Sequence, residues 1–272
     1  MTGLGARMMG ATVCRLVLAD RLGRMRRSRG LTLKTVAGAL YVSSSKLCRI
    51  ESGRHRPTLA DVEQLADLYE VETDVRTQLL QWAQVAQGRS SYHAFADVAD
   101  AVLRDYLDVE QAGLRAVFGP VVLPAVLRTR GYARALYGGM GEAEAERRLS
   151  LLELRQRHFA DAGPKPVRIL LGEAALYGRL SGAEMMRKQH QWLRQAAELG
   201  VKLRVLPYER MALERCALSA FAVAAVNDDR CVLTARERMG GVWLGPDRNG
   251  RAAAWFEHLW QAAAEPGPQL AA

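Results

Sequence analysis

Residues 31–57 read LTLKTVAGALYVSSSKLCRIESGRHRP. This stretch contains two short helical patterns, separated by a tight turn at Tyr41 and Val42, and its second helix is polar and basic. Thr32 and Ser43 are placed to cap the two helices at their N-termini, and Gly53 is placed to end the second one. Two helices joined in this way can set the second helix into the major groove of DNA. The stretch therefore predicts a helix-turn-helix.

Helical patterns on both sides extend this pair to five helices. Apolar residues recur at helical spacing over residues 13–29 and are followed by a glycine, which favours a helix end. Thr58 can cap a fourth helix with an apolar face over residues 59–68, and a fifth helix is expected over residues 74–87. We therefore expect residues 13–88 to form an all-α DNA-binding domain.

The side chains of the two central helices divide into an inward and an outward set. Small or apolar side chains suited to the space between the helices are Ala37, Val42, Leu47 and Ile50. The outer face of the second helix is expected to contact base edges, where Arg and Lys favour guanine, through Ser44, Ser45, Lys46 and Arg49. Four further residues are better placed to hold phosphates, which fixes register without reading sequence: Lys34, Ser43, Arg54 and Arg56.

The chain has 272 residues and a formal net charge of +9, and the basic excess is concentrated in one segment. Residues 15–56 contain eleven Lys and Arg residues and two acidic residues, so the remainder of the chain is close to neutral. A local excess of this kind suits a polyanionic partner, because each neutralised phosphate releases counterions. We therefore expect double-stranded DNA as a partner; a solvated basic surface is the alternative that charge alone leaves open.

The composition is that of a globular protein, with 49% hydrophobic and 25% charged residues. Four cysteines lie far apart in the chain and show no metal-ligand spacing: Cys14, Cys48, Cys216 and Cys231. We therefore expect no metal and no cofactor. Most of these thiols are expected to lie in the core of a protein in a reducing cytosol. No uninterrupted apolar run approaches the length of a membrane span, so no membrane partner is expected. The N-terminus resembles no export signal, and residues 1–12 are expected to be a flexible extension. These features predict a cytoplasmic, nucleoid-associated protein.

The remaining two thirds of the chain change character along their length. Residues 88–91 are small and polar and are the expected linker. Residues 92–162 are expected to be mainly helical, with helices over 95–110 and 142–160, whereas residues 114–127 fit either a short strand or an extended segment.

Residues 163–264 alternate between strand and helix patterns. The expected elements are strands at 167–171 and 201–206 with a helix at 182–199 between them, a hairpin of 220–226 with 231–234, and a last helix at 248–264. This order predicts a small α/β sheet, followed by a flexible tail at 265–272.

The motif of residues 42–57 resembles the signature VSxSxISRIExGxRxP of Xre/Cro-type, lambda-repressor-like regulators, and the similarity extends over residues 20–72. The resemblance implies that Glu51 and Gly53 are structural, with Glu51 tying the recognition helix to the following loop. Many members carry Gln at the start of the second helix as a phosphate contact, but this chain has Leu33 there. Lys34 is the expected substitute.

The C-terminal region resembles a group of actinobacterial, antitoxin-like regulators in which an Xre domain precedes an uncharacterised module. Residues 110–115 and 122–133 are similar to the group's ExEAxxIRxY and VPGLLQTxxYAR segments, and residues 172–176 and 205–208 to its DEAAL and VLPF motifs. The resemblance implies a DNA-binding regulator that is often encoded beside a small acidic partner protein. The chain departs from the pattern at Leu123-Pro124-Ala125, where members often have Pro-Gly, and at Cys216, where a Gly or another small residue is common.

No residue set in the chain predicts catalysis. His158, His190 and His258 lie in helical patterns beside aromatic residues, and none has a Lys two positions later, as an HxKxxxxD phosphodiesterase requires. Glu173 follows a predicted strand, a position where α/β folds often place function, but a carboxylate that caps a helix or ties a loop is the favoured interpretation. There is also no phosphate-binding loop or nucleophile elbow. We therefore expect a protein that is not an enzyme.

Together these patterns predict a mainly α fold with an α/β C-terminal part: a five-helix, lambda-repressor-like DNA-binding domain, a helical segment and a small α/β sheet domain. The expected function is that of a homodimeric transcriptional regulator, a repressor or activator on a palindromic operator. Residues 92–264 would supply dimerisation and bind a small acidic partner protein or a small-molecule effector. Two alternatives stay open, an antitoxin that neutralises a cognate protein and controls its own operon, and a DNA-tethered hydrolase.

Overall fold

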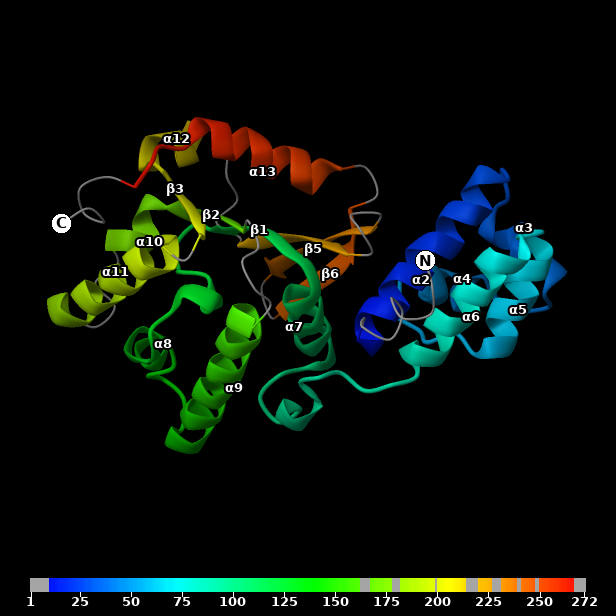
Figure 1. Cartoon of the computed structure of the whole chain (residues 1–272), viewed down its shortest axis with the longest axis horizontal. Coiled ribbons are helices and arrows are strands. Elements are labelled where there is room, and N and C mark those ends of the chain that lie inside the picture. Colours follow the sequence, from blue (N-terminus) through cyan, green and yellow to red (C-terminus); the bar gives the residue numbers. More distant parts are fainter. Residues whose placement is uncertain are drawn as a thin grey trace.

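The computed structural model describes residues 10–161, 167–177, 182–198, 200–213, 220–226, 231–238, 241–247 and 250–266. Its N-terminal part consists of five helices (Figure 1), namely α2 Ala11–Ser28, α3 Leu33–Ala39, α4 Ser44–Glu51, α5 Leu59–Leu68 and α6 Thr73–Ala86. All five were predicted from the sequence, and their bounds differ from the predicted ones by two residues or fewer. The expected helical N-terminal region is confirmed.

Side chains at the N-caps explain why three of these helices begin where they do. Thr32 Oγ1 accepts a hydrogen bond from the Thr35 amide at 3.0 Å, and Ser43 Oγ accepts one from the Lys46 amide at 3.1 Å. At the start of α5, Thr58 and Asp61 form a reciprocal capping box. Each cap satisfies a backbone donor that the first helical turn leaves unpaired.

The second part combines helices with a sheet. Its helical elements are η1 His93–Phe95, α7 Ala101–Gly113, η2 Ala125–Leu127, α8 Arg130–Leu136, α9 Glu142–Asp161, α10 Glu173–Tyr177, α11 Ala183–Glu198, α12 Tyr208–Leu213 and α13 Arg251–Ala262. Its strands are β1 Leu114–Gly119, β2 Arg168–Gly172, β3 Lys202–Leu206, β4 Phe221–Val226, β5 Cys231–Arg238 and β6 Gly241–Pro246. A mainly helical chain with a small mixed sheet near its C-terminus confirms the predicted fold class.

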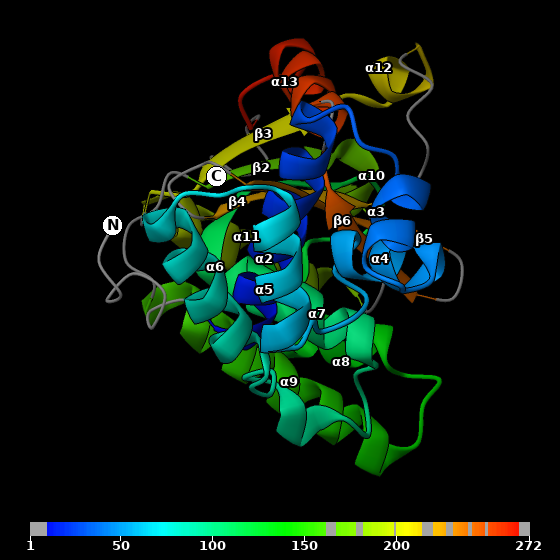
Figure 2. The same cartoon turned by 90° about the vertical axis from the view of Figure 1, so that its right-hand side faces the viewer.

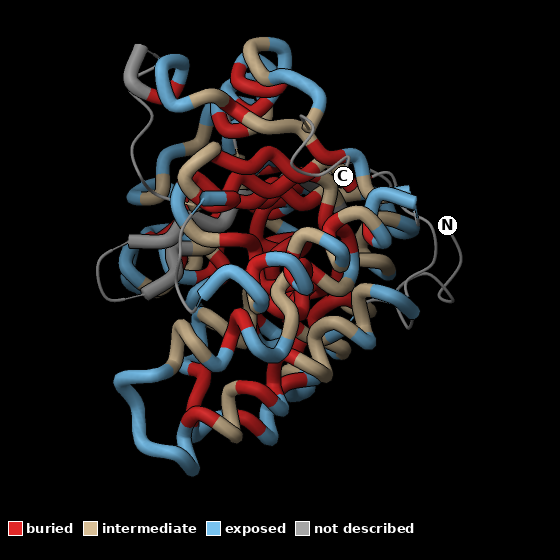
Figure 3. Tube along the Cα trace, turned by 90° about the vertical axis from the view of Figure 1, so that its left-hand side faces the viewer, coloured by how far each residue is buried: buried red, intermediate tan, exposed pale blue. Residues whose placement is uncertain are grey.

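The strands form one sheet in the order β3-β2-β1-β4-β5-β6, parallel from β1 to β3 and antiparallel from β4 onward. Alternation along β2 sends side chains to both faces: Ile169 and Leu171 pack with residues of α11, whereas Leu170 packs with residues of α13. The sheet therefore lies between two helical layers (Figure 1), and Figure 3 shows buried residues concentrated in its strands.

Several elements differ from the prediction. The helix expected over residues 95–110 is interrupted, because Asp100 caps a new helix by accepting from the Leu103 amide at 2.7 Å. Residues 114–127, for which the sequence left two possibilities open, form strand β1 and the short helix η2. Strand β6 was not predicted, since Gly241, Gly245 and Pro246 weaken its strand pattern.

The five N-terminal helices pack against the second part. Their apolar cluster includes Val109 of α7, Ala224 of β4 and Leu233 of β5, and Figure 2 shows the N-terminal helices in front of the sheet. Helix α2 lies between the two parts and is buried over much of its length, from Thr12 to Met25.

Polar contacts fix α2 against α7. Thr12 Oγ1 donates to Asp108 Oδ2 at 2.6 Å, and Arg15 forms an ion pair with Asp105 at 2.5 Å. The other oxygen of Asp108 accepts from the Ser91 amide at 3.0 Å, which ties down the segment that was predicted to be a linker. The first turn of α2 is thus bonded to a helix about ninety residues later in the chain.

Within the described ranges, no helix combines the length and apolar character needed to cross a lipid bilayer. Some expectations fall outside those ranges: Cys216, the start of the expected α/β region at 163–166, the connection inside the expected hairpin at 227–230, residues 1–9 of the predicted extension and residues 267–272 of the predicted tail.

Candidate nucleic-acid interface

Helix α4 has a buried face and a polar face. Leu47 and Ile50 are almost fully buried, whereas Ser44, Ser45 and Arg49 are exposed. The buried pair anchors the helix in the N-terminal core. Three of the four residues predicted to contact bases are therefore presented on one exposed helix, beside the tight turn that precedes it.

Lys46, the fourth predicted base contact, differs from the other three. Its ammonium lies 2.5 Å from Asp61 Oδ1 and is partly buried. Burial alone would raise the pKa of Asp61, but hydrogen bonds from Lys46 and from the Thr58 amide lower it overall. The structure thus gives Lys46 an intramolecular partner that the sequence pattern did not indicate.

A buried ion pair holds α4 to α2. The Glu51 carboxylate accepts from Arg26 Nε at 2.6 Å and from Arg26 Nη2 at 3.0 Å, and Arg26 Nη1 also donates to the Leu31 carbonyl at 2.6 Å. The hydrogen bonds that Arg26 donates to Glu51 raise the pKa of Arg26. This bidentate pair joins α4 to an earlier helix, whereas the family resemblance implied a tie to the following loop.

Gly53 ends α4 at a point of close contact. Its φ is +71°, and a Cβ there would lie 2.6 Å from Leu16 Cδ2 of α2. Only glycine satisfies both the left-handed backbone and this approach. Together with the small, buried Ala37 and the half-buried Val42, Gly53 lets α2, α3 and α4 pack closely.

The residues predicted to contact phosphates surround α4. Lys34 is exposed on α3, Ser43 caps α4, and Arg54 and Arg56 are exposed in the loop that follows. Arg56 Nη1 also donates to the Gln87 carbonyl at 3.4 Å, so the loop is connected to the end of α6.

Two residues of this surface were not among the predicted DNA contacts. Tyr41 is 97% exposed and has a φ of +54° in the turn before Ser43. An aromatic residue in the predicted turn between two helices is the sequence signal that could have identified it. Cys48 is exposed on α4, so it is not one of the thiols inside the core. Cys14 does fit that expectation, and burial raises the pKa of its thiol to about 12.

The C-terminal residues considered for catalysis have separate structural contacts. Glu173 accepts from the Tyr208 amide at 2.8 Å, which is the capping role that the sequence favoured. His158 Nδ1 lies 2.9 Å from the Tyr92 hydroxyl, His190 Nε2 lies 3.2 Å from the Leu176 carbonyl, and His258 stacks on Trp255. The described part of the chain contains no group of three His, Cys, Asp or Glu side chains that could hold a metal ion.

Comparison with known proteins identifies the class of both parts. Residues 17–80 match a family described as a helix-turn-helix domain. The HTH-type transcriptional regulator DdrOP3 of Deinococcus deserti is 42% identical over 52 residues, which are 19% of this chain and 40% of that protein. The chain thus matches less than half the length of this relative. These similarities and the exposed α4 identify the N-terminal part as a helix-turn-helix domain.

The larger part of the chain defines its family. Residues 103–268 match the family described as a domain of unknown function (DUF5753), and this match covers more than half of the chain. The protein belongs to the DUF5753 family. No solved structure matches the chain.

Proposed function

We propose that the protein is an Xre-type transcriptional regulator that reads a specific operator with α4. The observation that supports this proposal is the polar face of α4, which is exposed to solvent above the buried Leu47, Ile50 and Glu51. This face lies in the segment that carries the net positive charge of the chain. An α-helix of this kind fits the major groove of B-DNA.

The proposed contacts follow from the side chains around α4. Ser44, Ser45 and Arg49 face bases. Lys46 also contacts DNA when the negative charge of the phosphates displaces it from its ion pair with Asp61. Lys34, Ser43, Arg54 and Arg56 hold phosphates on either side. Ala37, Val42, Ile50, Glu51 and Gly53 keep the helices in position.

We further propose that the regulator is a homodimer acting on a palindromic operator in the cytoplasm, at the nucleoid. A symmetric dimer presents two copies of α4 to successive major grooves, so the half-sites would lie one helical turn of DNA apart. Residues 13–88 would carry DNA binding, and residues 92–264 dimerisation and regulation. We infer no catalytic role for the chain, because Glu173 and the three histidines each have a structural contact instead of a shared site.

A mobility-shift titration at physiological salt tests the proposal. Fragments of the protein's own promoter should bind more tightly than random duplex of the same length, and the complex should contain two chains per site. Equal affinity for all duplexes would contradict sequence-specific regulation. A single chain per site would contradict the dimer.

The controlling signal would be a small-molecule effector or a small acidic protein. Co-purification of a stoichiometric small protein encoded next to this gene would favour the antitoxin role. A small molecule that shifts the melting temperature of the isolated protein would favour sensing, because a ligand that binds only the folded state stabilises it.

A further inference from the structure

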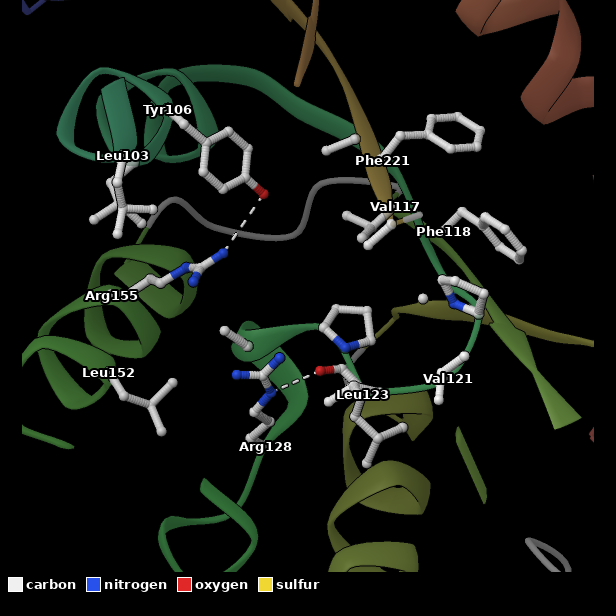
Figure 4. A pocket seen from close by; sticks show the side chains of 18 of the residues that line it. Leu103, Tyr106, Val117, Phe118, Val121, Leu123, Arg128, Leu152, Arg155 and Phe221 are labelled. Atoms are coloured by element: carbon white, nitrogen blue, oxygen red, sulfur yellow. Dashed lines mark hydrogen bonds between the residues drawn. The ribbon is translucent and has the colours of Figure 1, made fainter. Parts of the chain in front are cut away.

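The second part of the chain contains a cavity of about 490 Å³ between α7, α9 and the segment that joins β1 to η2. This volume lies within the range of small-molecule sites in proteins. Figure 4 shows that Arg155 and Leu152 of α9 border it together with Tyr106 of α7, Arg128, and Val117 and Phe118 of β1.

The lining is apolar except for a cationic side. Leucine, valine, phenylalanine, alanine and proline residues supply most of the wall, and Arg128, Arg148 and Arg155 supply the charge. No Asp or Glu is among the described residues that line the cavity. A wall of this composition is complementary to a molecule with an apolar body and an anionic head.

Two of the arginines retain donors for such a head. Arg155 bonds Glu110 through Nε at 2.5 Å and through Nη2 at 2.6 Å, and Arg148 bonds Glu144 through Nε and Nη2. A guanidinium has five N–H donors. Within the described chain these bonds leave the Nη1 amino group of both arginines available, while the carboxylates hold the guanidinium groups in place.

One helix connects the cavity to the DNA-binding part. Leu103, Tyr106 and Leu107 of α7 line the cavity, whereas Asp105 and Asp108 of the same helix bond Arg15 and Thr12 of α2. Helix α2 in turn holds α4 through the Arg26–Glu51 pair. A ligand that shifts α7 therefore acts on the element that positions α4.

We propose that this cavity binds a small organic carboxylate with an apolar body, and that occupancy changes the DNA affinity of the protein through α7 and α2. The second half of this proposal rests on the proposed function of α4. The carboxylate lies against Arg148 and Arg155, and the body of the ligand lies against the apolar wall of β1 and α7.

The test uses the full chain and four probes, octanoate, decanoate, phenylbutanoate and naphthoate, each beside its neutral primary amide. Thermal shift and calorimetric titration measure binding without DNA. At least one carboxylate should raise the melting temperature, and its amide should bind about ten-fold more weakly, since it lacks the charge-assisted bonds. If none of the four carboxylates binds, or if an amide binds as well as its acid, the proposed ligand class is wrong.

Variants locate the site. Arg148→Gln, which removes a partly exposed guanidinium at the cavity, should weaken binding about ten-fold, and Val121→Trp should block the cavity. Arg157→Gln makes the same change at an exposed position of α9 that does not line the cavity, and should bind like the parent. If Arg148→Gln and Val121→Trp both bind like the parent, the site lies elsewhere.

The bound carboxylate is then added to the DNA titration of the parent and of Val121→Trp. A change in DNA affinity in the parent alone supports the coupling, and no change in the parent overturns it. Failure of the ligand-free parent to bind DNA would contradict the proposed function of α4, while the binding experiment without DNA would still decide the cavity.

Discussion

At the scale of single residues, the structure separates side chains that the sequence pattern treats alike. Ser44, Ser45, Lys46 and Arg49 are equivalent in the motif, yet Arg49 is exposed whereas Lys46 is paired with Asp61. Arg49 is therefore the strongest candidate for reading a base, because a guanidinium can bond guanine through two donors.

Replacing Arg49 by Ala should weaken binding to the operator by about 1–3 kcal/mol and relax sequence preference at one position. Replacing Lys34, which is exposed on α3, should weaken binding to all sequences and reduce its dependence on salt. Titrations of specific and random duplexes at several salt concentrations measure both effects. If both variants bind like the parent, α4 does not lie in the groove as proposed.

Asp61→Asn should destabilise the protein at neutral pH by about 1–2 kcal/mol, because it removes the bond to Lys46 and weakens the capping box of α5. The pKa of Asp61 is lowered in the folded protein. Its contribution is therefore complete above the unfolded pKa of about 3.9 and is lost as the pH falls through the lower folded value.

Urea unfolding of Asp61→Asn and of the parent at pH values from neutral to strongly acidic checks this dependence. Asp67→Asn is the matched control on the same helix, since its ion pair with Arg76 is exposed and should contribute little. A difference between Asp61→Asn and the parent that persists unchanged in acid would contradict the assigned ion pair.

At the scale of elements, the N-terminal helices were predicted mainly from local sequence features. Thr32, Ser43 and Thr58 cap helices as expected. These caps could be predicted because a capping residue and the apolar periodicity that follows it both depend on a few neighbouring residues. The interruption before α7 and strand β6 were missed. Asp100 starts a helix inside a stretch with continuous helical character, and β6 is held by pairing with β5, which sequence spacing alone does not show.

The glycine that ends α4 provides a test at this scale. Gly30 and Gly53 both have positive φ, but a Cβ at Gly30 would meet nothing within 4 Å whereas one at Gly53 would meet Leu16 at 2.6 Å. Gly30→Ala should cost about 1 kcal/mol from the backbone alone, and Gly53→Ala about 2 kcal/mol or more. Equilibrium unfolding measures the difference, and equal losses would show that the approach to Leu16 is relaxed at no cost.

At the scale of the whole molecule, α2 belongs to the helix-turn-helix and also to the interface with α7. This second role could not be predicted from the sequence. The partners of Thr12 and Arg15 are about ninety residues away, and Arg15 interrupts an apolar pattern as if it faced solvent. The same distance explains why the cavity residues, which come from α7, α9 and β1, were not grouped from the sequence.

Asp108→Ala should loosen this interface, because the Thr12 hydroxyl and the Ser91 amide lose their shared acceptor. Amide hydrogen exchange in α2 and in residues 88–100 should become faster, whereas exchange in β1–β3 should not change. Asp97→Ala, which removes an exposed partner of Arg147, is the control. Unchanged exchange in α2 of Asp108→Ala would show that these bonds do not hold the two parts together.

The contact between α2 and α7 also limits how the two parts of this chain could be recombined with those of a relative. Residues 88–91 are the obvious place to join the N-terminal part of this chain to the C-terminal part of a relative. In such a hybrid, Thr12 and Arg15 would face the α7 helix of the relative. They would have a carboxylate partner only if that helix carried acidic residues at the positions of Asp105 and Asp108. Recombination between relatives at residues 88–91 should therefore give stable proteins only where both parents have matching residues at the α2–α7 contact, so that the two parts evolve together.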